Sequence, residues 1–132
     1  MLRDQDSHPD CINVKDRLLQ LCADSGRAEQ CLVRIACREL ETFYLADLKA
    51  VGTALGMNGI VRRQNSSKFR SPDGLGCPSR ELKMLTDNRY EKVAGSREIG
   101  RFLDLENERS PSFRNLVAAI RRMENELLSD SV

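Results

Sequence analysis

The clearest helical signal in the sequence is residues 110–128, SPSFRNLVAAIRRMENELL. Ser110 and Pro111 are residue types that favour the N-cap and the first turn of a helix. Apolar residues then recur at spacings of three and four, which places them on one helical face: Phe113, Leu116, Val117, Ile120, Met123 and Leu127. This stretch predicts a long amphipathic helix.

Helical spacing also dominates the N-terminal part of the chain. Asp10 is a candidate N-cap for a helix that ends at Ser25 and Gly26. Residues 28–56 carry a second and stronger pattern, which predicts either one helix or two with a break at residues 42–44. No alternation typical of a strand extends beyond a few residues.

The sequence therefore predicts an all-α fold, a small bundle of five or six helices. Residues 1–10 are polar and predict a flexible N-terminal arm. We expect a single helical domain over residues 11–132. It is divided into N-terminal helices, a long basic central loop and C-terminal helices, at 11–57, 58–78 and 79–132.

The central loop is rich in turn-forming residues and unusually basic. Five cations and a single acid lie between residues 58 and 80, although the whole chain has a net charge of only +1. We expect four of these cations, Arg62, Arg63, Lys68 and Arg70, to contact phosphates, and Phe69 to stack on an exposed base. The alternative is a flexible connector whose charge offsets acidic helices.

The C-terminal region has the order of a helix-turn-helix. Ser96 is a candidate N-cap for a helix over residues 96–105, and a polar turn separates it from the helix that begins at Ser110. In that arrangement the second helix presents its first turn to the major groove. The predicted contacts to bases or phosphates are Ser112, Arg114 and Asn115, with Arg121 and Arg122 beside the DNA backbone. The alternative is a helical hairpin in the core of a bundle.

Two short motifs resemble the helix-turn-helix DNA-binding domain of the bacterial replication initiator. Residues 98–100, EIG, are followed by residues 118–124, AAIRRME, and residues 36–40, ACREL, are similar to the helix that precedes EIG in that family. The resemblance implies binding to DNA rather than RNA. In this chain more than 50 residues separate ACREL from EIG, whereas in the family they are nearly adjacent.

The chemistry of several enzyme classes is missing from the sequence. His8 is the only histidine, and the five cysteines include no C-x-x-C pair, so we expect neither a nucleophile–histidine site nor a zinc site. No glycine-rich phosphate-binding motif occurs. We therefore expect no enzyme activity, no metal and no cofactor.

The expected function is that of a small intracellular protein that binds nucleic acid or regulates another process. The first ten residues do not resemble a signal peptide, and no apolar run is long enough to cross a membrane, so we expect neither secretion nor membrane insertion. The alternative is an adaptor that binds a protein partner through an apolar helix face, on the stripe of residues 32–55 or of residues 113–127. The sequence defines no oligomeric state.

Overall fold

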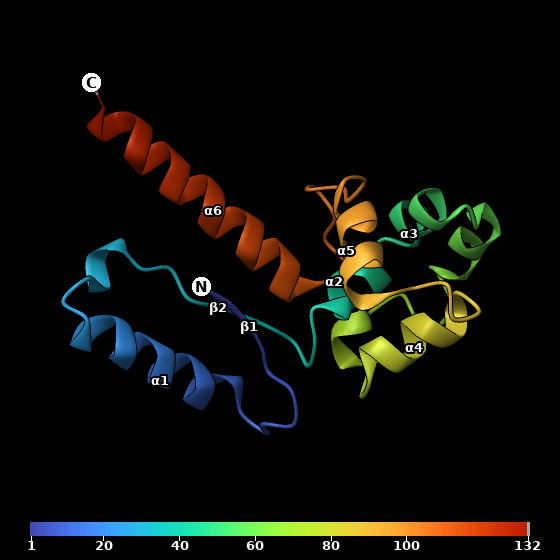
Figure 1. Cartoon of the computed structure of the whole chain (residues 1–132), viewed down its shortest axis with the longest axis horizontal. Helices are drawn as coiled ribbons and strands as arrows, with labels where there is room; N and C mark the ends of the chain where they lie inside the picture. Colours follow the sequence, from blue (N-terminus) through green and yellow to red (C-terminus); the bar gives the residue numbers. More distant parts are fainter. Residues whose placement is uncertain (132) are drawn as a thin grey trace.

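The structure is a computed structural model that describes residues 1–131 of the 132-residue chain. Over this range the fold is predominantly helical, with one small sheet (Figure 1). The strands are β1 (Leu2–Asp4) and β2 (Arg34–Ala36). The α-helices are α1 (Cys11–Asp24), α2 (Glu41–Leu45), α3 (Leu48–Leu55), α4 (Pro78–Leu85), α5 (Lys92–Gly100) and α6 (Pro111–Asp130). Three short 3-10 helices join them: η1 (Ala28–Gln30), η2 (Asn58–Arg63) and η3 (Pro72–Gly74).

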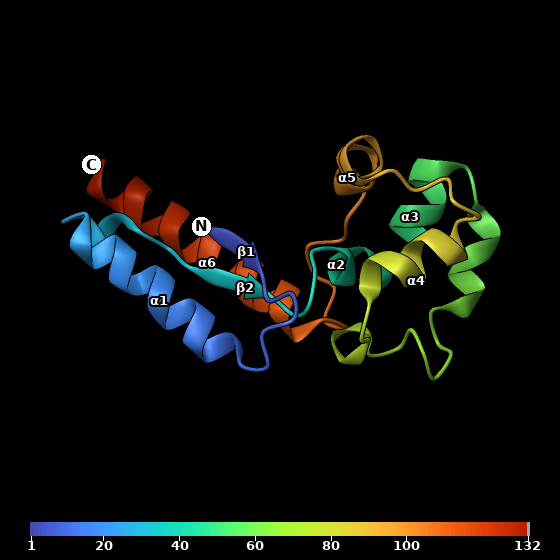
Figure 2. The same ribbon diagram turned by 60° about the horizontal axis from the view of Figure 1, so that its bottom comes forward.

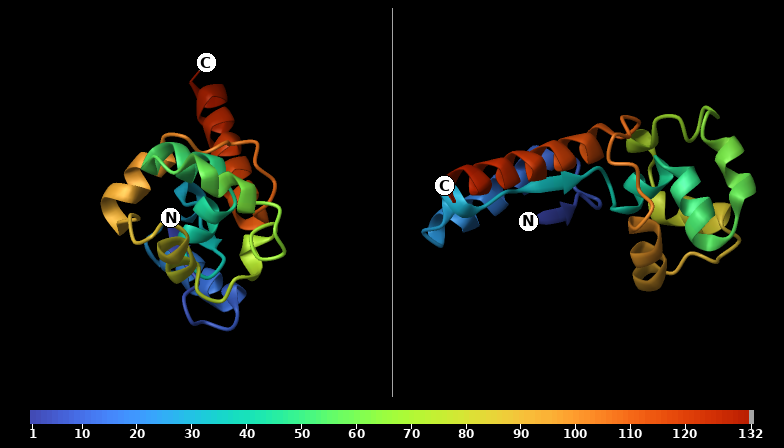
Figure 3. Two further views of the ribbon diagram at one scale, coloured as in Figure 1. Left: turned by 90° about the vertical axis from the view of Figure 1, so that its right-hand side faces the viewer. Right: turned by 90° about the horizontal axis from the view of Figure 1, so that it is seen from above.

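The molecule is elongated and has two ends of different architecture. One end contains α1, the two strands and most of α6, and the other is a cluster of α2 to α5 (Figures 1 and 3). The rings of Phe43 in α2 and Phe113 in α6 pack with centroids 5.2 Å apart. This contact lies within one core that also includes Ala36 of β2, so the two ends are joined by buried apolar packing.

The N-terminal end is a strand–helix–strand unit with parallel strands. Residue Leu2 pairs with Arg34, and Asp4 pairs with Ala36. β2 runs between α1 and α6 (Figure 2). Val33, just before the strand, packs with the buried face of α1, whereas Ala36 belongs to the core that contains the first turns of α6. The alternation of side chains along a strand explains why β2 meets one helix on each face.

The prediction of a predominantly helical fold is confirmed, and the two helices with the clearest N-caps lie where the sequence places them. Asp10 accepts a hydrogen bond from the backbone N–H of Ile12 at 2.8 Å. Ser110 accepts one from the N–H of Phe113 at 3.2 Å. These side chains satisfy N–H groups that have no partner inside the helix, which fixes where each helix begins.

The prediction of a flexible arm over residues 1–10 is wrong for its first part. Residues 2–4 form β1, and the backbone N–H of Arg34 donates to the carbonyl of Met1 at 2.9 Å. A strand of three residues is too short to show alternation in the sequence, because only one or two side chains lie on each face. Residues 2–4 are ordered by their pairing with β2 and not by a local sequence pattern.

The prediction of helix throughout residues 28–56 is also wrong. Residues 34–36 form β2, and the break between the following helices falls at Ala46 and Asp47 rather than at residues 42–44. A strand that is covered on both faces carries apolar residues on both faces. Over a few residues, this pattern cannot be distinguished from the apolar spacing of a helix. The Asp47 side chain accepts from the N–H of Ala50 at 3.1 Å and thereby caps α3.

The helix expected at residues 96–105 begins earlier and ends earlier, as α5 (Lys92–Gly100). Gly95 lies inside this helix rather than at its start. A Cβ atom at Gly95 would lie 2.8 Å from the Tyr90 ring, so glycine allows the helix to approach that ring. This close packing against the Tyr90 ring explains why the position holds a glycine.

Candidate functional site

The basic segment, which we define as residues 58–70, is ordered and anchored to the helical cluster. Its buried residue Gln64 makes three hydrogen bonds: it accepts from the N–H of Leu48 at 2.8 Å and donates to the carbonyls of Leu45 and Phe69 at 3.0 and 2.8 Å. The amide of one side chain thus joins the segment to α2 and α3. The cations of the segment are carried on a fixed backbone rather than on a flexible connector.

Phe69 does not have the stacking role that the sequence predicted. Its side chain is only 2% exposed and belongs to the main core. The charged groups of Arg63 and Lys68 each lie 5.8 Å from the centre of its ring. Phe69 therefore supports two cations from beneath, and the prediction that it contacts a base is wrong for this structure.

The cations of the basic segment are exposed and mostly free of acidic partners. Lys68 forms an ion pair with Glu81 of α4 at 2.6 Å. Within residues 1–131, no ion pair involves Arg62, Arg63 or Arg70. Three guanidinium groups of this short segment are thus available to an anion from outside the chain.

The first turn of α6 is occupied by a side chain from elsewhere in the protein. The carboxylate of Asp73 in η3 accepts from the hydroxyl of Ser110 and from the backbone N–H of Ser112 at 3.1 Å. In addition, α5 packs chiefly against α3, and α6 packs chiefly against β2. The structure therefore does not pair these helices as a helix-turn-helix, and the first turn of α6 is not free to read a groove.

The other predicted contacts on α6 lie away from the basic segment. Asn115 lines a groove beside β2, and its carbonyl accepts from the Arg34 side chain at 3.5 Å. Arg121 is paired with Glu106, and Arg122 lies 3.7 Å from Glu126. Arg114 is exposed on the first half of the helix.

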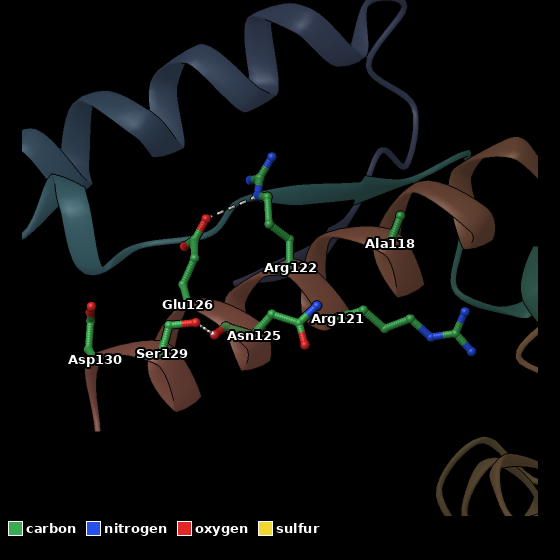
Figure 4. A pocket seen from close by; sticks show the side chains of 7 residues that line it. All are labelled: Ala118, Arg121, Arg122, Asn125, Glu126, Ser129 and Asp130. Atoms are coloured by element: carbon green, nitrogen blue, oxygen red, sulfur yellow. Dashed lines mark hydrogen bonds and ion pairs between the residues drawn. The ribbon is translucent and has the colours of Figure 1, made fainter. Parts of the chain in front are cut away.

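The exposed side of α6 carries no cleft of its own. Figure 4 shows seven side chains around a shallow depression there, and Arg121 and Arg122 leave the helix in different directions. All seven residues come from α6, so the depression is open surface along one helix. Figure 2 places the second half of α6 at the opposite end of the molecule from η2. Arg121 and Arg122, in this half of α6, therefore do not form one surface with the basic segment.

A carboxylate cluster around the buried Glu41, which the sequence analysis missed, lies where the parallel strands end. Glu41, at the start of α2, is 1% exposed, and its Oε1 accepts from the Tyr90 hydroxyl at 2.9 Å. Its Oε2 has no hydrogen-bond partner. Burial, and then the charges of Asp6 and Glu41, raise the pKa of Asp4 at the end of β1. Residues 4 and 41 are far apart in sequence, and only strand pairing brings them together.

The cluster adjoins a cavity of about 740 Å³. Glu41 and Tyr90 line it together with three cations, Arg80, Lys83 and Lys92. Burial raises the pKa of Tyr90, so its hydroxyl stays protonated and donates to Glu41. Among residues 1–131, no group of three acidic, cysteine or histidine side chains is arranged to hold a metal ion. The cluster can accept hydrogen bonds, and the cations can contact an anion.

The chain matches a known protein family over most of its length. Residues 4–121 match the family described as "Domain of unknown function (DUF4276)", and the protein belongs to that family. The match begins at Asp4, the last residue of β1, and includes β2, the basic segment and the first half of α6. Neither the curated proteins nor the solved structures contain a match to the chain. No helix within residues 1–131 is long and apolar enough to cross a membrane.

Proposed function

We propose that the protein binds nucleic acid through the basic segment, with DNA preferred over RNA. The observation that carries the proposal is the set of three unpaired arginines, Arg62, Arg63 and Arg70, on a segment anchored by the buried Gln64. Guanidinium groups match the geometry of phosphate oxygens. A segment that is already ordered loses less conformational entropy on binding than a flexible loop would.

An exposed aromatic side chain beside the segment favours single-stranded DNA. Phe102 is 48% exposed and lines a groove of about 470 Å³ together with Val61 and Asn65 of the basic segment. Lys49 and Arg109 line the same groove. Stacking of a base on an aromatic ring beside phosphate-binding cations is the usual chemistry of single-strand recognition. In this proposal Phe102 takes the stacking role that the sequence assigned to Phe69.

The acidic residues of this groove are already engaged within the protein. Asp47 accepts from the N–H groups of Ala50 and Asp104 at 3.1 and 2.8 Å. Asp104 in turn accepts from the N–H of Glu106 at 2.9 Å. Hydrogen bonds to these carboxylates reduce their repulsion of a phosphate, although they do not remove the charge.

The test is salt-dependent binding of a fluorescein-labelled 20-nucleotide single strand and of the matching duplex, measured by anisotropy. The variant R62A/R63A/R70A removes three cations from the segment, and R17A/R27A/R97A removes three exposed cations elsewhere as a control with the same net charge. We expect the first variant alone to reduce the slope of log Kd against log salt by about 2 to 3, since each phosphate contact contributes about 0.7 to 0.9. Equal binding by the two triple variants would refute the proposal.

A second variant tests the choice between single strand and duplex. Phe102→Ala removes the exposed ring and leaves the charges unchanged. We expect a loss of affinity of about fivefold or more for the single strand, since stacking on one base contributes about 1 to 3 kcal/mol. The duplex, whose bases are covered, should bind this variant as well as the parent. An equal loss for both would show that the ring has no stacking role.

A second candidate function, as an adaptor for a protein partner, rests on exposed apolar side chains at the strand-containing end. Residues 32–55 are mostly buried, but the apolar stripe of α6 is covered only in its first half. Ile120 and Leu127 are 52% and 63% exposed, and Ile12 of α1 is 63% exposed. Exposed apolar side chains on these helices provide surface that a partner protein can cover.

A further inference from the structure

The edge of β2 that faces away from β1 carries unpaired backbone groups. The N–H of Arg34 donates to Met1, and the carbonyl of Ala36 accepts from the N–H of Gln5 at 3.1 Å, so these two residues of β2 face β1. In a parallel ladder alternate residues bond across to a given neighbour. The N–H and carbonyl of Ile35 therefore face the other side, where residues 1–131 supply no third strand.

This free edge opens into a groove between two helices. The groove has a volume of about 650 Å³ and is lined by residues from α1, from β2 and from α6. Ile12 of α1, Ile35 of β2 and Ala119 of α6 provide apolar surface within it. A free strand edge carries the hydrogen-bonding groups that accept one more extended chain.

The charges around the groove favour an acidic occupant. Three cations line it, namely Lys15, Arg34 and Arg122, and the acid in the lining is Asp73. Arg122 lies 3.7 Å from Glu126, and both side chains of this pair are exposed, so an acidic occupant competes with Glu126 for it. Asp73 is engaged by the first turn of α6. Arg34 donates from Nη1 to the carbonyl of Val33 at 2.8 Å, so its side chain covers one acceptor at the free edge. An added strand can replace that contact, which leaves the Arg34 side chain held by its 3.5 Å bond to the carbonyl of Asn115 and frees Nη1 for an acidic side chain.

We propose that an extended acidic segment of a partner protein adds to the free edge of β2 as a third strand. Its backbone pairs with Ile35, and its side chains alternate between the two flanking helices, so its carboxylates meet either Lys15 of α1 or Arg34 and Arg122 on the side of α6. The inference rests on the second candidate function, the adaptor role, and names the chemistry of its partner. It is independent of the nucleic-acid proposal, because the groove and the basic segment lie on different elements.

The probe is a fluorescein-labelled eight-residue peptide that alternates Val and Glu, compared with one that alternates Val and Lys. We expect the acidic peptide to bind at least tenfold more tightly in an anisotropy assay. The double variant K15E/R122E should reverse this preference. The variant R62A/R63A/R70A, with three cations removed elsewhere, should bind the acidic peptide like the parent protein.

Backbone pairing is tested with two N-methylated acidic peptides, one methylated at every Val and the other at every Glu. Alternate N–H groups of an added strand face β2, so one of these peptides should lose at least tenfold in affinity and the other should not. Equal binding of both would overturn the proposal, and an adaptor role through side chains alone would then remain.

Two further outcomes would also overturn the proposal. One is displacement of the acidic peptide by the 20-nucleotide strand in both the parent and R62A/R63A/R70A, which would assign the groove to nucleic acid. The other is a dimer in sedimentation velocity that K15E/R122E dissociates, which would assign the edge to a second copy of the chain. A monomer that binds the peptide with the expected charge and methylation dependence supports the proposal.

Discussion

Replacement of Gln64 by leucine tests whether one buried side chain holds the basic segment in place. The side chain is 5% exposed, and its amide satisfies the N–H of Leu48 and the carbonyls of Leu45 and Phe69. Leucine has a similar size but no polar atoms. The variant therefore removes three hydrogen bonds and leaves three backbone groups without their partner.

The magnitude follows from the number and burial of these groups. A buried backbone group that loses its partner costs about 1 to 3 kcal/mol. The segment can move and admit water to some of the groups, so we take the lower end of that range for each. The expected loss in the free energy of unfolding is about 3 kcal/mol. This is a large share of the roughly 5 to 15 kcal/mol that stabilises a typical domain.

The assay is urea unfolding followed by circular dichroism at 222 nm. Asn65→Ala is the matched control, because Asn65 is adjacent and exposed and its loss should change stability by no more than about 0.5 kcal/mol. Q64L should also speed hydrogen exchange in residues 58–70 more than in α6. A loss below about 1 kcal/mol with an unchanged m-value, or an equal loss in N65A, would show that Gln64 is not the anchor.

Three further changes follow from individual contacts. Asp4→Asn should stabilise the protein at pH 7, because burial and two neighbouring carboxylates raise the pKa of Asp4 and its ionised form opposes folding. In the parent protein this cost grows as the pH rises from 3.8 through the raised pKa of Asp4. Urea unfolding should therefore give Asp4→Asn a higher free energy of unfolding than the parent at pH 7, and the difference should disappear below pH 3.8. Gly95→Ala should lower the free energy of unfolding by about 1 to 3 kcal/mol in urea unfolding, since the Cβ of the alanine would lie 2.8 Å from the Tyr90 ring. Gly100→Ala, with nothing within 4 Å, should be neutral or stabilising, and a similar loss in both would refute the packing argument. Asp73→Ala should lower the melting temperature through a loss of about 2 kcal/mol, because it removes hydrogen bonds to a charged group at the start of α6, and an unchanged melting temperature would show that these bonds contribute little.

The candidate site could be predicted only in part, because the sequence reports charge but not burial. The positive charge of residues 58–70 is visible in the composition, and all four of its cations are exposed. Phe69 and Phe102 look equivalent in the sequence, yet one is buried in the core and the other lies on the surface. Which of two phenylalanines faces solvent depends on packing between segments that are distant along the chain.

The carboxylate cluster shows the same limit more sharply. Nothing in the sequence distinguishes Asp4 and Glu41 from the other acidic residues, and neither spacing nor composition links the two. Their interaction arises because parallel pairing of β1 with β2 brings the ends of both strands to one edge. Tyr90, which donates to Glu41, comes from a third part of the chain, 49 positions further on.

The sequence by itself determined the helical character of the chain and the ends of its two clearest helices, because helical periodicity and N-caps are local and act over a few residues. Only the tertiary structure decided the small parallel sheet, the docking of the basic segment and the occupation of the first turn of α6 by Asp73. Each of these depends on hydrogen bonds between residues 16 to 39 positions apart. Such contacts form only when the whole chain has folded, since no local pattern rewards them beforehand.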